Sequence, residues 1–223
     1  MKTVAFIPVR GGSKSIPLKN IKEINGMPLV YWTVKAASDC QFIDEVYVAT
    51  DSDIIRSTVN SFGLDKVQVI ERSEESASDT ASTESAMLEF AEKVEFDNIV
   101  LIQATSPLLK YTDLDRGFVY FFEEGTDSVM SVVRQKRFIW EERGGFVEPI
   151  NYDYMHRPRR QDFDGFLVEN GAFYINSKKA LLLNGNRLSG RIRAVEMREE
   201  SYFEIDEPSD WIIVEKLMKQ VLE

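Results

Sequence analysis

The sequence predicts an α/β protein with a Rossmann-like, three-layer α/β/α arrangement around a mainly parallel sheet, in a single domain over residues 1–223. Short runs of apolar, β-branched residues alternate with segments of helical periodicity, which implies crossover connections and parallel strands covered on both faces. Polar clusters follow several strand ends. Apolar residues make up 43% of the 223 residues, which is enough for one substantial core.

The apolar runs fix the expected strands. The run at 98–103 (NIVLIQ) is the most apolar, so we expect it near the centre of the sheet. The run at 191–197 alternates in character, which is typical of an edge strand. The expected strands are, in order, 4–7, 44–50, 67–70, 98–103, 128–133, 171–175 and 191–197.

Capping and helix-breaking residues mark the helices between these strands. Pro28 and Pro208 suit the first turn of a helix, and Gly63 and Gly125 suit helix ends. The expected helices are 28–38, one capped by Asp51 or Ser52, one ending near 93 with Ala86, Met87, Phe90 and Ala91 on one face, 112–123, 178–183, and one beginning at Pro208 with Trp211, Val214, Leu217 and Val221 buried.

Residues 135–165 depart from this alternation. Helical periodicity fades there, Gly144-Gly145 breaks the chain, and six aromatic residues are scattered through the segment. We interpret it as an excursion from the sheet. Exposed aromatic side chains are typical of protein interfaces, so we expect a homodimer formed through this excursion. A mobile surface loop is the alternative.

Composition excludes several classes of function. The net charge of −10 argues against general nucleic-acid binding. No run of about 18 apolar residues exists to span a membrane. Met1 leads straight into a strand without a leader-like segment, so we expect a cytoplasmic protein if the source is bacterial. One cysteine, Cys40, excludes an internal disulfide, and one histidine, His156, makes a structural zinc site or a hydrolytic triad unfavoured.

The loop after the first strand is the first candidate site. It carries Gly11-Gly12 and the cations Arg10, Lys14 and Lys19, a pattern that suits a nucleoside triphosphate. An ordinary glycine turn with solvated lysines fits equally well. The P-loop and dinucleotide-binding fingerprints are both absent, which disfavours ATPase and dehydrogenase functions.

Three polar stretches downstream also follow strand ends. The hydroxyl-rich segment 72–83 could bind a ligand or be a linker, and Gln103 could bind a ligand or cap a turn. Glu204 and Asp206 are two residues apart, so in a strand both would point to one face. Two carboxylates on one face suit Mg²⁺.

Taken together, these motifs resemble the CMP-sialic acid synthetases (N-acylneuraminate cytidylyltransferases) over nearly the whole chain. The segment from 157 to 174 is similar to the vertebrate branch of that family. The matching motifs are IPVRGGSK at 7–14, ASDTAS at 77–82, LIQATSPL at 101–108, RPRRQDFDG at 157–165 continuing to ENGAFY at 169–174, and EID at 204–206.

The resemblance implies transfer of CMP from CTP to the anomeric hydroxyl of a nine-carbon 2-keto sugar acid, N-acetylneuraminate or its deaminated form KDN, with release of pyrophosphate. It implies a homodimer in which Arg157 reaches the neighbouring subunit. It also implies these roles: Arg10, Lys19 and Asp206 catalytic; Arg10, Gly12, Ser13, Lys14, Lys19, Asn20, Arg72, Ser78, Asp79 and Thr83 nucleotide-binding; Gln103, Arg157, Arg160, Gln161 and Asn170 sugar-binding; and Asp206 with Glu204 holding Mg²⁺.

Two positions depart from the family pattern. Glu204 stands where the family has aspartate, which leaves its contact with metal open. Thr83 stands where bacterial members often have serine, and the hydroxyl is kept. The alternatives are a synthetase for the eight-carbon acid KDO, for legionaminate or for pseudaminate, or an inactive nucleotide-sugar binding protein.

Overall fold

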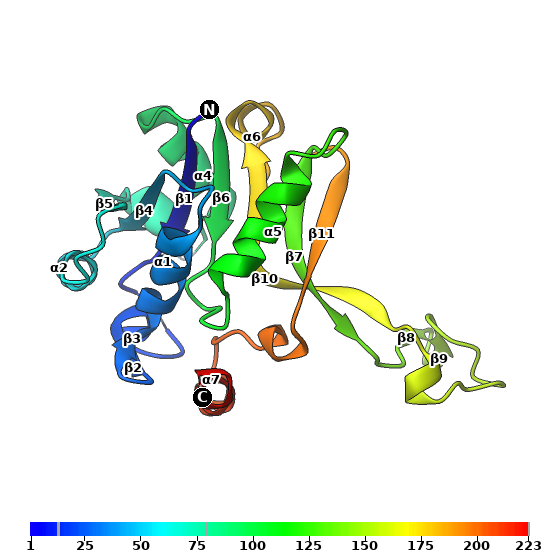
Figure 1. The fold of residues 1–223 in the computed structure, drawn as a ribbon. Coiled ribbons are helices and arrows are strands. Elements are labelled where there is room, and N and C mark those ends of the chain that lie inside the picture. Colours follow the sequence, from blue (N-terminus) through cyan, green and yellow to red (C-terminus); the bar gives the residue numbers. More distant parts are fainter. Residues whose placement is uncertain (13, 79, 223) are drawn as a thin grey trace.

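The computed structural model describes residues 1–12, 14–78 and 80–222. Within these residues one sheet has seven strands in the order β11-β7-β10-β6-β1-β4-β5 (Figure 1). Strands β6, β1, β4 and β5 are mutually parallel, β10 runs antiparallel between β6 and β7, and β11 is parallel to β7. The strands are β1 (Thr3–Pro8), β4 (Glu45–Thr50), β5 (Val67–Glu71), β6 (Asn98–Ile102), β7 (Ser128–Gln135), β10 (Phe166–Ser177) and β11 (Ile192–Met197).

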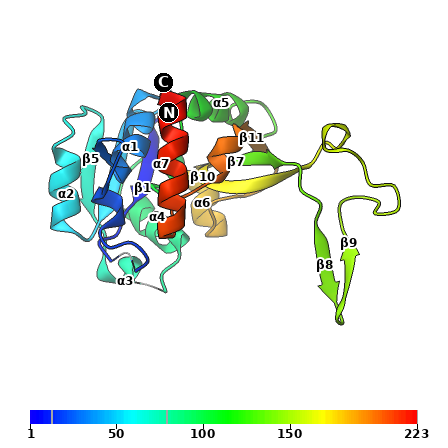
Figure 2. The same cartoon turned by 90° about the horizontal axis from the view of Figure 1, so that it is seen from below.

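Helices cover both faces of this sheet, which confirms the three-layer prediction. One face carries α1 (Leu29–Asp39), α2 (Asp53–Asn60) and α5 (Tyr111–Phe121), and the other carries α4 (Thr83–Lys93) and α6 (Lys178–Asn184). The long α7 (Pro208–Leu222) lies beyond the carboxyl ends of the parallel strands (Figures 1 and 2). The short elements are η1 (Lys19–Ile21), β2 (Glu23–Ile24), β3 (Met27–Pro28), α3 (Glu74–Ala77), η2 (Arg160–Asp162) and η3 (Glu199–Tyr202).

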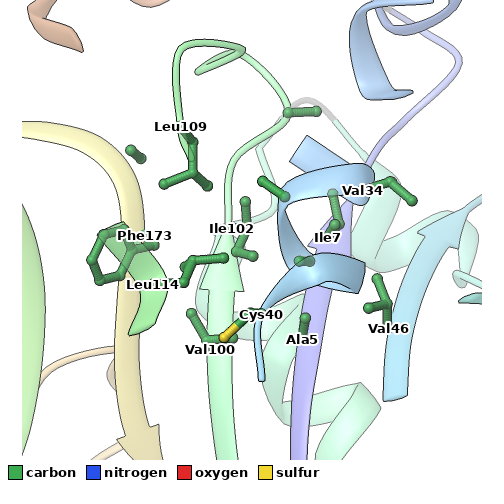
Figure 3. Close-up of a cluster of buried hydrophobic side chains, with 14 of the residues drawn as sticks. Ala5, Ile7, Val34, Cys40, Val46, Val100, Ile102, Leu109, Leu114 and Phe173 are labelled. Carbon is green, nitrogen blue, oxygen red and sulfur yellow. The ribbon is translucent and has the colours of Figure 1, made fainter. Parts of the chain in front are cut away.

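The core is centred on β6, as its apolar character predicts. Every residue of this strand is buried: Val100 and Ile102 face one helical layer, and Ile99 and Leu101 face the other. Figure 3 shows the first of these clusters, in which side chains of the sheet meet those of α1 and α5. Burying each large aliphatic side chain contributes roughly 1.5–3 kcal/mol to the free energy of folding. Because β6 is buried on both faces, it gives a rigid base for the residues that follow its carboxyl end.

Most of the expected elements are present, with shifted ends. The last helix begins at Pro208, but Pro28 lies in β3, directly before α1. Ser52 occupies the N-cap of α2 without a side-chain capping bond. The neighbouring Asp51 accepts a bond from the backbone N–H of Gly11 at 2.9 Å. The segment 72–83, interpreted from the sequence as a ligand-binding stretch or a linker, contains α3. Trp211 and Val214 are buried and Leu217 is partly buried, whereas the side chain of Val221 lies outside the described part.

The excursion at 136–165 leaves the sheet as expected. It contains the hairpin β8 (Trp140–Arg143) and β9 (Phe146–Pro149), which projects well away from the body of the molecule (Figure 2). Phe138 packs against Tyr152 and Phe163, with ring centroids 4.4 and 5.0 Å apart. His156 lies on this projection and bonds Asp153 at 2.8 Å. Among the described residues, no helix is both long and apolar enough to cross a membrane.

Candidate functional site

A cleft of about 320 Å³ opens at the carboxyl ends of β1 and β6. This is the edge at which open α/β sheets bind ligands. It brings together side chains from four separate loops. Its lining residues are Pro8, Arg10, Lys19, Asn20, Arg72, Ser78, Ala81, Thr83, Gln103, Ala104 and Thr105, of which Arg10, Lys19, Asn20, Arg72, Ser78, Thr83 and Gln103 are residues singled out from the sequence.

The loop after β1 is fixed by bonds to its own backbone. Gly11 approaches Ser52 so closely that an added Cβ would lie 3.0 Å from the Cβ of that serine, which explains the glycine. The buried Asn20 donates from its side-chain amide to the carbonyl of Arg10 at 3.1 Å. Asn20 therefore shapes the loop that presents the guanidinium of Arg10 to the cleft.

Arg72, directly after β5, also lines the cleft. Its Nε donates to the hydroxyl of Ser76 at 3.4 Å, and its Nη2 donates to the Ser76 carbonyl. Burial is the main cause of the lowered pKa of Arg72; the charge of Asp51 opposes this effect and the charge of Arg10 adds to it. Two guanidinium groups thus act on one another across the cleft, an arrangement that suits an anion with several negative charges.

Lys19 links the first loop to the acidic segment near the C-terminus. Its Nζ donates to the carbonyl of Ile205 at 2.8 Å and to Oδ1 of Asp206 at 3.0 Å. The lysine side chain is 13% exposed and the aspartate side chain 60% exposed. A largely buried cation that lines the cleft therefore meets an exposed carboxylate.

Glu204 has a different set of neighbours from Asp206. Residues 203–205 form no strand and connect η3 to α7, so the condition under which both carboxylates would point to one face of a strand is not met. Oε2 of Glu204 accepts a bond from the hydroxyl of Thr105 at 3.4 Å. Burial, followed by the nearby charge of Asp206, raises the pKa of the Glu204 carboxyl.

Other expected residues lie away from the cleft. Gly12 and Lys14 are exposed and do not contribute to its lining as described, while Ser13 and Asp79 lie outside the described residues. Asn170 is buried, and its side-chain amide donates to the carbonyl of Ser201 at 2.9 Å.

The expected sugar-binding residues of the excursion are exposed on the projection. The guanidinium of Arg157 lies 4.5 Å from the ring centroid of Phe138. Nη2 of Arg160 lies 3.5 Å from Oε1 of Glu199, in the element that leads to Glu204. Gln161 is exposed in η2. Within one chain, these side chains and the cleft are separate.

Sequence reasoning missed four lining residues: Pro8, Ala81, Ala104 and Thr105. Thr105 is the one of these four that forms a side-chain hydrogen bond to a candidate site residue: its hydroxyl donates to Glu204, 99 residues away in the chain. Its signal was available, since Thr105 follows Gln103 by two residues at the end of the central strand.

Comparisons with known proteins identify the family and the class of fold. Residues 4–222 match a family model described as cytidylyltransferase. Relatives named N-acylneuraminate cytidylyltransferase are 42% identical over 217 residues in Oncorhynchus mykiss and 29% identical over 223 residues in Streptococcus agalactiae. They cover 95% and 96% of this chain. The chain spans about half the length of these relatives, 49% and 52%.

Solved structures support the fold. A CMP:2-keto-3-deoxy-manno-octonic acid synthetase complexed with CTP matches with a TM-score of 0.74 at 21% identity, covering 99% of this chain and 100% of that one. A 4-diphosphocytidyl-2C-methyl-D-erythritol synthase from Anaerococcus prevotii matches with a TM-score of 0.71 at 13% identity, covering 98% and 96%. The arrangement of strands and layers is therefore shared well beyond detectable sequence similarity.

Proposed function

Because the chain belongs to the cytidylyltransferase family, we propose that it transfers CMP from CTP to the anomeric hydroxyl of a nine-carbon 2-keto sugar acid. The observation that carries this proposal is the cleft in which Arg10, Lys19 and Arg72 converge beside Gln103. Three cations suit a triphosphate, and an amide at the end of the central strand suits a hydroxylated acceptor. The relatives' names supply the class of acceptor.

In the proposed reaction, the anomeric oxygen forms a bond to the α-phosphorus of CTP as the bond to the bridging oxygen of the β-phosphate breaks. Pyrophosphate leaves with the bonding electrons, and the hydroxyl proton passes to solvent or a nearby base. Arg10 and Arg72 stabilise the negative charge that develops on the phosphate oxygens in the transition state, and Lys19 stabilises the leaving pyrophosphate. Ser78 and Thr83 lie on the wall where hydroxyls can bond the ribose or the cytosine edge.

Mg²⁺ is the ion we propose for this reaction. The donors fit: Asp206 offers an open carboxylate, and Mg²⁺ is commonly held by one or two carboxylates together with substrate phosphates. No cluster of three or more His, Cys, Asp or Glu side chains that could hold a metal occurs in the described part of the chain, which suits an ion that arrives with the nucleotide. When bound, the ion supplies positive charge to the phosphate oxygens and the attacking hydroxyl.

The experiment is pyrophosphate release on mixing protein, CTP and Mg²⁺ with N-acetylneuraminate, KDN, KDO, legionaminate or pseudaminate in separate reactions. We expect the highest kcat/KM with N-acetylneuraminate or KDN, because the vertebrate and the streptococcal relatives are all named N-acylneuraminate cytidylyltransferase. Asp206→Asn is the control. If no acid gives release while calorimetry detects CTP binding, the inactive binding protein is correct instead.

A homodimer formed through residues 135–165 is part of this proposal. The projection exposes large apolar side chains on both faces of the hairpin and in the segment after it: Trp140, Phe146, Val147, Ile150, Tyr154 and Met155. The same projection carries three exposed polar side chains, those of Arg157, Arg160 and Gln161. In a dimer formed through the projection, these side chains would enter the cleft of the partner subunit. Sedimentation at micromolar concentration tests it: we expect a dimer, and Phe146→Asp should shift the mass toward the monomer. A monomeric wild type contradicts it.

We also propose that the protein acts in the cytoplasm if its source is a bacterium. Cys40 is its one cysteine, it is buried, and burial raises the pKa of its thiol to about 12. A single unreactive thiol suits a reducing compartment. Fractionation of cells that express the tagged protein tests this; recovery in the periplasmic or membrane fraction contradicts it.

A further inference from the structure

A corner beside the cleft is formed by residues that are distant in the chain, and two of them, Gln103 and Thr105, also line the cleft. Gln103 and Thr105 come from the loop after β6, Gly171 from β10, and Glu204 from the connection to α7. Their side chains or backbone meet at hydrogen-bond or van der Waals distance.

Gly171 is the floor of this corner. The pairing of β10 with β7 shifts register between Glu169 and Tyr174, and Gly171 lies in that irregularity with φ +70°. A Cβ at Gly171 would lie 3.3 Å from Oε1 of Gln103 and 3.3 Å from Oε2 of Glu204. The amide of Gln103 and the carboxylate of Glu204 therefore lie against the same α-carbon.

The acidic segment sends its two carboxylates to different partners. The N–H of the buried Ile205 donates to the carbonyl of Thr105 at 2.9 Å, which fixes the segment along the loop after β6. On one side of Ile205, Asp206 pairs with Lys19, and on the other Glu204 bonds Thr105. Asp206 is thus on the triphosphate side, and Glu204 is beside Gln103.

Buried polar groups brace the corner from behind. Asn170, next to Gly171, donates to the carbonyl of Ser201, three residues before Glu204. Oδ1 of Asn170 and Oγ of Ser106 and Ser201 have no protein partner among the described residues. Asn170 therefore links the residue next to Gly171 to η3 and helps to fix the shape of the corner.

From this geometry we infer that Glu204 is a specificity-determining residue that binds hydroxyl groups of the acceptor together with Gln103, and that Asp206 alone of the pair serves the metal. The inference rests on the proposed function and names a subsite within it. A carboxylate accepts bonds from two hydroxyls, whereas an amide both donates and accepts. The pair is suited to neighbouring hydroxyls of a polyhydroxylated acid.

The test compares Glu204→Gln and Asp206→Asn in two assays. The first measures KM for the sugar acid, KM for CTP and the Mg²⁺ concentration for half-maximal rate. The second measures Mn²⁺ binding to the protein–CTP complex by electron paramagnetic resonance, without turnover. For Glu204→Gln we expect KM for the sugar acid to rise at least about tenfold, with the metal measurements within twofold of wild type. For Asp206→Asn we expect Mn²⁺ binding to weaken at least about tenfold.

Two further variants keep the test decisive. Glu200→Gln removes an exposed carboxylate four residues earlier and should leave all four quantities unchanged. Thr105→Val removes the bond to Glu204 while keeping the carboxylate, and should raise KM for the sugar acid about threefold without a change in Mn²⁺ binding; it serves if Glu204→Gln unfolds. Weakened Mn²⁺ binding with an unchanged KM for the sugar acid in Glu204→Gln overturns the inference. Absence of wild-type turnover with every acid refutes the proposed function itself and the inference with it.

Discussion

Lys19, the first residue of η1, and Asp206, just before α7, form an ion pair of 3.0 Å although they are 187 residues apart in the chain. The same Nζ also donates to the carbonyl of Ile205, so the lysine, which lines the cleft, holds the acidic segment beside it. This contact brings together segments from near the two ends of the sequence. It leaves the aspartate side chain 60% exposed.

Asp206→Asn is therefore expected to abolish turnover while leaving the fold intact. An amide keeps the size of the side chain but loses the charge that attracts the metal and pairs with Lys19. Because the carboxylate is exposed, the pair should contribute no more than about 1 kcal/mol to stability. Steady-state kinetics and thermal unfolding check both parts. Near-normal turnover would show that Asp206 does not serve the metal, and Glu207→Gln, one residue on, is the control for loss of a charge.

Gly171→Ala should lower both stability and activity. The left-handed φ of +70° costs a non-glycine residue about 1–2 kcal/mol, and the added methyl would press on Gln103 and Glu204. Gly185→Ala is a matched control, since Gly185 has φ +61° with nothing within 4 Å of an added Cβ. We expect similar losses in the free energy of unfolding for both variants, measured in urea. Only Gly171→Ala should lower kcat/KM for the sugar acid. An equal decrease in kcat/KM for Gly171→Ala and Gly185→Ala would contradict a role of this corner in binding the acid.

The fold was predictable because its signals are local. The alternation of strands and helices, the central position of β6 and the buried face of α4 all follow from periodicity within about ten residues. Part of the cleft followed too: Arg72, Thr83 and Gln103 each lie just beyond a strand end or at a helix start, and parallel strands end at one edge.

The rest depended on contacts that the sequence does not display. The partner of Glu204 lies 99 residues away, and Asn170 is buried against Ser201, 31 residues on. Whether residues 204–206 pair as a strand depends on neighbours in space, and here no strand forms. The hairpin β8–β9 was masked by scattered aromatic residues that pack within the excursion.

Stability should fall in acid partly through Glu89. Burial raises the pKa of this carboxyl, but hydrogen bonds from Lys93, Ser76 and Ser73 outweigh it and hold the pKa at about 2, below its ordinary value of 4.5. The depressed pKa means that the stabilisation is complete above about pH 4.5 and is lost as the pH falls through 2. Glu89→Gln should therefore reduce the free energy of unfolding by about 1–3 kcal/mol at pH 7, with the difference from wild type shrinking toward pH 2.

Urea unfolding between pH 7 and pH 2.5 measures this difference. Glu92→Gln, on an exposed position of the same helix, is the control for loss of a charge. Glu89 also fixes Ser73, next to Arg72, at 2.8 Å, so the variant should weaken CTP binding modestly. A difference that stays constant with pH would contradict the assigned pKa.

The ion pair between Arg187 and Glu84 should have a larger coupling energy than the exposed ion pair between Lys35 and Asp39. Nε of Arg187 lies 2.5 Å from Oε1 of Glu84, both side chains are about one-fifth exposed, and the guanidinium lies 5.0 Å from the ring centroid of Tyr174. The hydrogen bond from Arg187 lowers the pKa of Glu84. Glu84 is in the first turn of α4, next to Thr83 of the cleft, so the pair fixes that helix start against β10.

A double-mutant cycle with Arg187→Met and Glu84→Gln measures the coupling. We expect about 1–3 kcal/mol, because removing either partner leaves a half-buried charge without its counterion. The exposed pair Lys35–Asp39, 2.5 Å apart on α1, should give only about 0.3–0.5 kcal/mol in the same cycle with Lys35→Met and Asp39→Asn. Thr83 is the first residue of α4, so its position depends on the ion pair that fixes this helix start. Arg187→Met should therefore also raise KM for CTP, and Arg187→Lys should bring KM part of the way back to the wild-type value. Equal coupling energies in the two pairs would mean that burial does not strengthen the interaction between Arg187 and Glu84.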